Sequence, residues 1–167
     1  MTRIVLLSDS HGYLDQALIP FLNECDEIWH AGDFGRDVYD QLHQLNKPLR
    51  GVYGNIDGPD VRSTFTENLI WTVEKTKIFM THIGGYPGKY SSRVQKTLME
   101  EMPQIYVCGH SHILKIIYDK KLNLLHLNPG ACGKEGFHKV RTALKFMIDG
   151  EKIKEMGVIE LGLPPAP

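Results

Sequence analysis

The segment Ile4-Val5-Leu6-Leu7-Ser8-Asp9-Ser10-His11 places four apolar residues shortly before an aspartate and a histidine. A short apolar run bounded by polar residues or glycine is typical of a strand that is buried on both faces. Asp9 and His11, two metal-binding residue types, stand where that strand ends. The same arrangement recurs through the first two thirds of the chain, and this recurrence predicts the fold class.

Four more apolar runs follow the first one. They comprise residues 28–29, 49–53, 78–80 and 105–108. Between several of them, apolar residues recur at the i, i+3/i+4, i+7 spacing of an amphipathic helix. These helical patterns cover residues 14–22, 38–45 and 94–102. Because strands alternate with helices, the pattern predicts an α/β fold with parallel strand pairing.

The second half of the chain has a different pattern. From Ile113 onward the helical signal fades, and consecutive strands joined by turns such as Asp149-Gly150 are predicted. These strands cover residues 113–118, 122–127, 142–148 and 153–159. We expect them to form a largely antiparallel sheet packed against the first. We predict one domain over residues 1–161 and a loose proline-rich tail over residues 162–167.

The bulk composition excludes several classes of protein. The chain has 167 residues, of which 42% are hydrophobic and 23% are charged, and its formal net charge is -1. A nearly neutral chain offers no basic field for nucleic acid. No apolar run approaches the roughly 20 residues that span a bilayer, and the first apolar run is too short for a signal peptide. We therefore expect a cytoplasmic protein that binds neither membrane nor nucleic acid.

The three cysteines are Cys25, Cys108 and Cys132. Their odd number and the lack of Cys-x-x-Cys spacing argue against a disulfide framework and against a zinc ribbon. We expect all three to be reduced. Cys108 ends an apolar run, so we interpret it as a small core residue rather than a nucleophile.

Metal-ligand residue types follow five apolar runs in turn. The motifs are Asp9-x-His11, Gly32-Asp33, Gly54-Asn55, His82 and Gly109-His110-x-His112. In an open α/β sheet, ligands bind outside the carboxyl ends of the strands, so residues far apart in sequence meet there. An isolated Gly-Asp pair would carry no information, but this ordered series predicts one site with seven candidate ligands.

The chemistry of the seven side chains is coherent. Two carboxylates, four imidazoles and one amide suit Mn²⁺, Fe, Zn²⁺ or Co²⁺ better than Ca²⁺ or a thiolate cluster. The set is too large for one metal, and a carboxylate can bridge two cations about 3.5–4 Å apart. Two divalent cations against two carboxylates leave surplus positive charge, which favours an anionic substrate such as a phosphate ester.

The ordered series resembles the calcineurin-like metallophosphoesterase superfamily, and the short chain is similar to its small bacterial and archaeal phosphodiesterase branch. The resemblance covers residues 3 to about 130. It implies a two-sheet β-sandwich flanked by helices in four layers, α/β/β/α. It also implies two divalent metals, with Mn²⁺ as the first expectation and Fe, Zn²⁺, Co²⁺ and Ni²⁺ as alternatives, and a turn at Asn128-Pro129-Gly130 near the site.

The resemblance also implies how the ligands are shared, with Asp33 bridging the two metals. One metal would be held by Asp9, His11, Asp33 and His112. The other would be held by Asp33, Asn55, His82 and His110, which are also the predicted catalytic residues. We expect a bridging hydroxide to attack phosphorus in line, while the metals, His82 and His110 neutralise the charge that develops. The expected substrate is a small phosphate ester, and first of all a diester.

One departure from the family bears on the mechanism. Many larger members carry histidine directly after the Gly-Asn motif, whereas this chain has Ile56, which cannot donate a proton. Protonation of the leaving group therefore has no assigned residue. Asp57 is a candidate for this role, and it alternatively caps the turn at Gly58-Pro59 or orients a ligand.

A non-catalytic function is the main alternative. A related retromer subunit resembles this fold and serves mainly as a protein-interaction scaffold, so the fold does not guarantee turnover. A scaffold has no reason to keep every ligand, and here all seven positions are filled, which favours the enzyme. The sequence does not identify the substrate or the native metals. It is compatible with a monomer and with a homo-oligomer.

Other polar and aromatic residues carry weaker signals. His30 is either a partner of a ligand or a buried histidine satisfied by the backbone. Surface or packing roles are the simplest for His43, His126 and His138. Four basic residues either hold phosphate or are solvated charges, and we leave them out of the site: Arg50, Lys89, Arg93 and Lys115. Tyr86 and Tyr90 either form the floor of a pocket or belong to a mobile loop, and we favour the loop.

Overall fold

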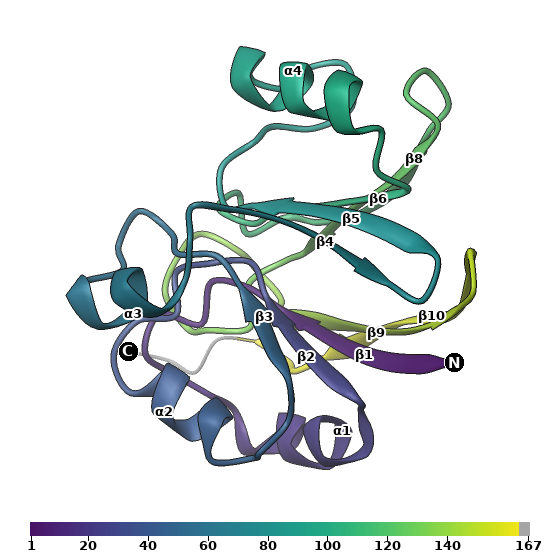
Figure 1. The fold of residues 1–167 in the computed structure, drawn as a ribbon. Helices are drawn as coiled ribbons and strands as arrows, with labels where there is room; N and C mark the ends of the chain where they lie inside the picture. The colour runs from purple at the N-terminus through teal and green to yellow at the C-terminus, as the bar shows by residue number, and fades with distance from the viewer. Residues whose placement is uncertain (164–167) are drawn as a thin grey trace.

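The computed structural model describes residues 1–163, and strands alternate with short helices in its first part (Figure 1). These elements are β1 (Thr2–Leu7), the 3-10 helix η1 (Gln16–Leu18), α1 (Ile19–Glu24), β2 (Glu27–His30), α2 (Val38–His43), β3 (Leu49–Gly51) and α3 (Pro59–Thr64). The remaining elements are β4 (Asn68–Val73), β5 (Thr76–Thr81), α4 (Ser92–Glu101), β6 (Ile105–Val107), β7 (Leu114–Asp119), β8 (Leu124–Pro129), β9 (Thr142–Asp149) and β10 (Lys152–Glu160).

The strands of residues 1–163 form two five-stranded sheets, in the orders β10-β9-β1-β2-β3 and β4-β5-β6-β8-β7. Both sheets are mixed. In the first, β1, β2 and β3 are parallel and β9 runs antiparallel to β1. In the second, β5, β6 and β8 are parallel, and the edge strands β4 and β7 are antiparallel to their neighbours. Helices α1 and α2 cover the outer face of the first sheet and α4 that of the second (Figure 1), which confirms the predicted sandwich.

The sheet predicted for the second half is partly wrong. The four expected strands are present as β7 to β10, but they divide between the two sheets. Strands β9 and β10 extend the first sheet beside β1, whereas β8 pairs in parallel with β6. The periodicity of a segment predicts a strand but does not identify its partner, because pairing depends on the faces that the folded chain buries.

Neither α3 nor β4 is predicted from the sequence. The six residues of α3 are too few for the helical period to repeat. In β4, partly or fully buried Leu69, Trp71 and Val73 alternate with exposed residues. That alternation is the signal of a half-buried edge strand, and it identifies β4 in retrospect.

One core lies between the sheets. Ile4 and Leu6 of β1 belong to it, together with Trp29 of β2. The Trp29 ring packs edge-on against Trp71 of β4 and Phe146 of β9, with ring centroids 4.8 and 5.5 Å apart. The alternate residues of β1, Val5 and Leu7, belong to the second core under α1 and α2. Strand β1 is therefore buried on both faces, which explains its continuous apolar run.

The three cysteines agree with the prediction from the sequence. Cys25, Cys108 and Cys132 are free and buried, and burial raises the pKa of the Cys108 and Cys132 thiols to about 12. No helix within residues 1–163 is long and apolar enough to span a membrane. Of the predicted tail, residues 164–167 lie outside the described residues.

The position of β1 between two cores predicts a large effect of truncation. We expect Leu6→Ala to lower the free energy of unfolding by about 2–5 kcal/mol, because Leu6 is fully buried and leaves a cavity. Val158→Ala on β10 of the same sheet is the control, since Val158 is 39% exposed, and it should cost less than about 1 kcal/mol. Urea denaturation measures both, and equal losses would contradict the two-core arrangement around β1.

Candidate metal centre

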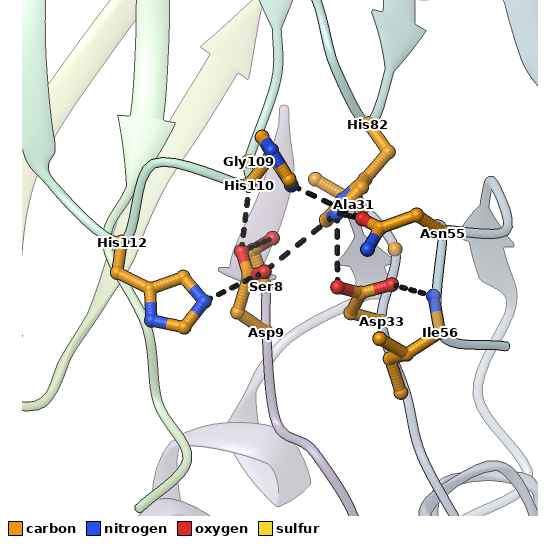
Figure 2. Close-up of polar contacts among 12 residues, drawn as sticks. Ser8, Asp9, Ala31, Asp33, Asn55, Ile56, His82, Gly109, His110 and His112 are labelled. Carbon is orange, nitrogen blue, oxygen red and sulfur yellow. Dashed lines mark hydrogen bonds and ion pairs between the residues drawn. The ribbon is translucent and has the colours of Figure 1, made fainter. Parts of the chain in front are cut away.

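The seven predicted side chains lie together where the strands that precede them end. Figure 2 shows Asp9, Asp33, Asn55, His82, His110 and His112. His11 joins them, since its Nε2 lies 3.5 Å from Asp33 Oδ2. The loops after β1, β2 and β3 supply Asp9, His11, Asp33 and Asn55 from the first sheet. The loops after β5 and β6 supply His82, His110 and His112 from the second sheet. The convergence predicted from the strand ends is therefore present, and it draws on both sheets rather than on one.

The ligand atoms of these residues form two groups. Within each group the atoms lie within 4.8 Å of one another, and the groups are Asp9, His11 and His112, and Asp33, His82 and His110. The Oδ2 atom of Asp33 lies 3.1 Å from His82 Nε2 and 3.5 Å from His11 Nε2. One carboxylate oxygen therefore lies against both groups.

The amide of Asn55 completes the second group. Its Oδ1 atom lies 3.1 Å from His82 Nε2 and 3.1 Å from His110 Nδ1. The part of the chain from 1 to 163 thus offers two mixed oxygen and nitrogen sets, each suited to a transition-metal cation.

The loops that carry these side chains have an unusual backbone. Five of the seven residues have a positive φ: Asp9 (53°), His11 (44°), Asp33 (57°), His110 (68°) and His112 (61°). This left-handed conformation costs a residue other than glycine roughly 1–2 kcal/mol. It persists because the surroundings impose it. Asp9 N–H donates to Gly32 O at 3.0 Å and His11 N–H donates to Asp33 O at 3.1 Å, which ties the first two loops together.

Two buried atoms support a bound cation. Asp9 Oδ1 and His11 Nε2 are buried and have no hydrogen-bond partner among residues 1–163. The other oxygen of Asp9, Oδ2, accepts hydrogen bonds from Ser8 Oγ at 2.6 Å and from the His110 N–H at 3.0 Å. An unpaired buried polar atom is costly and therefore needs an explanation. A metal ion bound to both atoms would satisfy them, so the residues fit such an ion.

The His82 ring also faces oxygen atoms. His82 Nδ1 lies 2.7 Å from the Ala31 carbonyl oxygen, which can only accept, so Nδ1 carries a proton. In the neutral ring, Nε2 would direct a lone pair at Asp33 Oδ2 and Asn55 Oδ1. These three atoms therefore need a positive charge between them, which either a metal ion or a second proton on the ring supplies.

The electrostatics of the site agree with this requirement. Burial alone would raise the pKa of Asp9, but the facing His11 and His112 outweigh it and lower that pKa. The pKa of Asp33 is likewise lowered against burial, mainly by the hydrogen bond with His82. Burial opposes charge on His82, yet Asp33 and Asp9 raise its pKa. The site therefore holds two anionic carboxylates and attracts cations.

Asp57 and His30 hold the loops in place. The Asp57 carboxylate accepts hydrogen bonds from the backbone N–H groups of Asp33 (2.9 Å), Gly54 (2.8 Å) and Gly35 (3.1 Å). His30 is fully buried between Ser10 Oγ (2.9 Å) and the Gly32 N–H (3.1 Å). Burial lowers the pKa of His30 to about 3, so the ring is neutral. Each residue thus positions the backbone that carries the candidate ligands.

His138 is a site residue that sequence reasoning misses. His138 Nε2 lies 2.9 Å from the Gly133 carbonyl oxygen and therefore carries its proton. Its Nδ1 then accepts a hydrogen bond from His112 Nδ1 at 3.2 Å. His112 is left with its lone pair on Nε2, which lies 3.1 Å from Asp9 Oδ1. A Cβ atom on Gly136 would lie 2.2 Å from His112 Nδ1, so glycine makes room for this contact.

The basic residues left out of the predicted site occupy different places. Arg50 pairs with Glu27 at 3.7 Å, and Lys89 is exposed in a loop. Arg93 borders a cavity of about 210 Å³ that Asn55 and His82 also line. The Arg93 guanidinium donates hydrogen bonds to Asn68 Oδ1 and the Ile83 carbonyl oxygen, at 2.6 and 3.1 Å.

Comparisons with known proteins agree with this geometry. Residues 2–151 match the family model of the calcineurin-like phosphoesterase superfamily domain. The chain therefore belongs to the calcineurin-like phosphoesterase superfamily. No curated protein gives a match.

Solved structures share the fold at low sequence identity. An archaeal phosphodiesterase is 24% identical with a TM-score of 0.74, over 95% of this chain and 99% of that one. A predicted phosphoesterase from Streptococcus pneumoniae is 24% identical with a TM-score of 0.72, over 95% and 89%. Vps29 from Entamoeba histolytica, solved with Zn²⁺, is 15% identical with a TM-score of 0.71, over 95% and 98%.

The positive φ of His110 predicts a difference between two substitutions of that residue. His110→Gly and His110→Ala remove the same imidazole from an exposed position, but only glycine adopts φ 68° without strain. We expect the glycine variant to be more stable than the alanine variant by about 1 kcal/mol. Urea denaturation without added metal measures the difference, and a more stable alanine variant would contradict strain at this position.

The contact with His138 predicts weaker metal binding when that ring is removed. We expect His138→Ala to weaken one of two metal positions by roughly 10–100-fold, because His112 loses the partner that fixes its tautomer. Isothermal titration with Zn²⁺ measures both positions. The control is His43→Ala, since His43 is exposed on α2. Identical isotherms for the His138 variant and wild type would remove His138 from the site.

Proposed function

We propose that this chain is a binuclear metal-dependent phosphoesterase that prefers phosphodiesters. The proposal rests on the position of Asp33 Oδ2, which lies close to both groups of ligand atoms. It is 3.1 Å from His82 Nε2 and 3.5 Å from His11 Nε2. Membership of the calcineurin-like phosphoesterase superfamily supports it. The proposed reaction is hydrolysis by in-line attack of water on phosphorus.

The proposed ligands are the seven predicted residues, with Asp33 shared between two metals. One set is Asp9, His11, Asp33 and His112, and the other is Asp33, Asn55, His82 and His110. We favour Mn²⁺, and the donor set also suits Fe, Zn²⁺, Co²⁺ or Ni²⁺. When bound, two such cations supply an acidified water and a clamp for the phosphoryl oxygens.

Neighbouring groups of this chain keep the ligands in position for that task. Ser8 Oγ and the His110 N–H hold Asp9 Oδ2, which leaves Asp9 Oδ1 directed at the imidazoles. The Ile56 N–H holds Asp33 Oδ1 at 2.9 Å, which leaves Asp33 Oδ2 free to be shared. Such fixed donors lower the cost of reorganisation when charge develops on the phosphoryl group.

Among residues 1–163, neither Ile56 nor Asp57, which follow Asn55, is suited to protonate the leaving group. Asp57 is 5% exposed and its carboxylate is engaged by three backbone N–H groups, so we assign it to orienting Asp33 and not to acid catalysis. Ile56, which is 47% exposed, offers no proton. Esters with good leaving groups should therefore react best.

A non-catalytic scaffold is the second candidate function. The likeness in fold to Vps29 supports it, and one such structure was solved with Zn²⁺. Metal binding alone therefore does not distinguish the two functions. Turnover does, because a scaffold has no need to activate water.

Removing the shared carboxylate should abolish turnover. We expect metal-stripped protein to hydrolyse bis(4-nitrophenyl) phosphate once Mn²⁺ is restored, and Asp33→Asn to lose at least about 100-fold in kcat/KM. Asp60→Asn, at an exposed aspartate in α3, is the control and should retain activity. 4-Nitrophenyl phosphate, a monoester, tests the preference for diesters. Metal binding without turnover for any tested divalent cation would favour the scaffold.

A further inference from the structure

A second cavity lies on the His110 side of the candidate metal centre. Its volume is about 300 Å³, and it lies between the loop after β5 and the start of β7. The side chains that matter to its chemistry are Ile83, Tyr86, His110, Ile113, Lys115 and His126. His110 therefore belongs both to the candidate metal centre and to the wall of this cavity.

The wall of the cavity is largely apolar. Ile83, Tyr86 and Ile113 are 45%, 42% and 61% exposed, which is a large apolar area beside a charged site. Exposed apolar side chains that gather around a hollow mark a ligand-binding surface. A cavity of about 150 Å³ lined by apolar groups holds a benzene ring. The present cavity is twice as large, so it can hold an aromatic ring with a substituent.

One positive charge faces this cavity without a carboxylate partner. Lys115 Nζ lies 4.2 Å from the centroid of the Tyr86 ring, and Lys115 forms no ion pair with any carboxylate of residues 1–163. His126 is 1% exposed, and its Nδ1 has no hydrogen-bond partner in the same part of the chain. Burial and then the charge of Lys115 lower the pKa of His126 to about 4, so the ring is neutral. The cavity thus offers one cation to an acceptor or an anion.

Hydrogen bonds fix both walls of the cavity. The Lys89 N–H donates to Tyr86 O at 2.8 Å and the Ser91 N–H donates to Gly84 O at 3.1 Å, which closes the loop that carries Tyr86. On the other side, Asn128 Nδ2 donates to Gly109 O and to Ser111 Oγ, both at 3.1 Å. A cavity with such walls is formed before a ligand arrives, and this lowers the entropic cost of binding.

We propose that this cavity binds the organic group of the substrate, and that the group is a planar aromatic ring bearing an acceptor or an anionic substituent. This inference rests on the proposed function. His110 belongs both to the metal centre that would bind the phosphate and to the wall of the cavity, so an organic group attached to that phosphate would reach the cavity. The ring packs against Tyr86 and Ile113, and its substituent meets Lys115. Tyr86 and Lys115 are thereby specificity-determining residues, in contrast to the loop and solvent roles predicted from the sequence.

Three phosphonates test the proposal, because a phosphonate is not hydrolysed and carries a single organic group. The probes are ethylphosphonate, phenylphosphonate and 4-carboxyphenylphosphonate, titrated calorimetrically into Mn²⁺-loaded protein. We expect phenylphosphonate to bind roughly tenfold more tightly than ethylphosphonate, and the carboxylate to add a further gain of several fold. All three share the phosphonate, so their ratios report the cavity alone.

Two variants test which residues determine the ratios of phosphonate affinity. We expect Tyr86→Ala to bring the phenyl-to-ethyl ratio close to one, and Lys115→Met to remove the gain from the carboxylate. The controls are Tyr118→Ala and Lys120→Met, exposed positions on and just after β7 that do not line the cavity, and they should leave both ratios unchanged.

The outcomes separate this proposal from the proposed function. Tight binding of all three probes with equal affinity would overturn the cavity proposal and leave the phosphoesterase intact. Wild-type ratios in the Tyr86 and Lys115 variants would also overturn it. If no phosphonate binds and no diester is hydrolysed, both proposals fail together.

Discussion

Two carboxylates, Asp9 and Asp33, are buried where the carboxyl ends of the two sheets meet, and four imidazoles surround them. Two like charges in a poorly solvated place repel each other and lack the stabilisation that water provides. The surrounding groups meet this demand only partly, since Asp9 Oδ1 stays without a hydrogen-bond partner among residues 1–163. A bound cation would supply the missing positive charge, and the four imidazoles would be among its ligands.

The backbone that places these side chains at the site is strained. A positive φ at five of the seven residues stores strain of roughly 1–2 kcal/mol at each. The strain is sustained by rigid neighbours, above all β1, which two cores bury, and the carboxylate of Asp57, which ties the loops of Asp33 and Gly54 together. Stability elsewhere in the sandwich thus supports a site that is unfavourable in isolation.

The strands that carry the site could be predicted because each follows a simple rule. An apolar run buried on both faces ends where a parallel strand ends, so Asp9, Asp33 and Asn55 could be placed at one edge without coordinates. His138 could not be placed in this way. It lies in a loop after β8 with no periodic pattern, and its contact with His112 depends on the path of that loop past Gly136. The division of β7 to β10 between two sheets escaped prediction for a similar reason, because strand pairing is a tertiary property.

The hydrogen bonds of Asp57 also bear on how the proposed enzyme would accelerate hydrolysis. The Asp57 carboxylate already accepts three backbone hydrogen bonds, and it would have to give them up in order to turn toward a leaving group. With Ile56 beside it, the rate must then come from two other sources. One is charge stabilisation at the metal centre, and the other is binding of the organic group away from the reacting atoms. The cavity beside His110 suits the second source, because its contacts are made by groups that take no part in proton transfer.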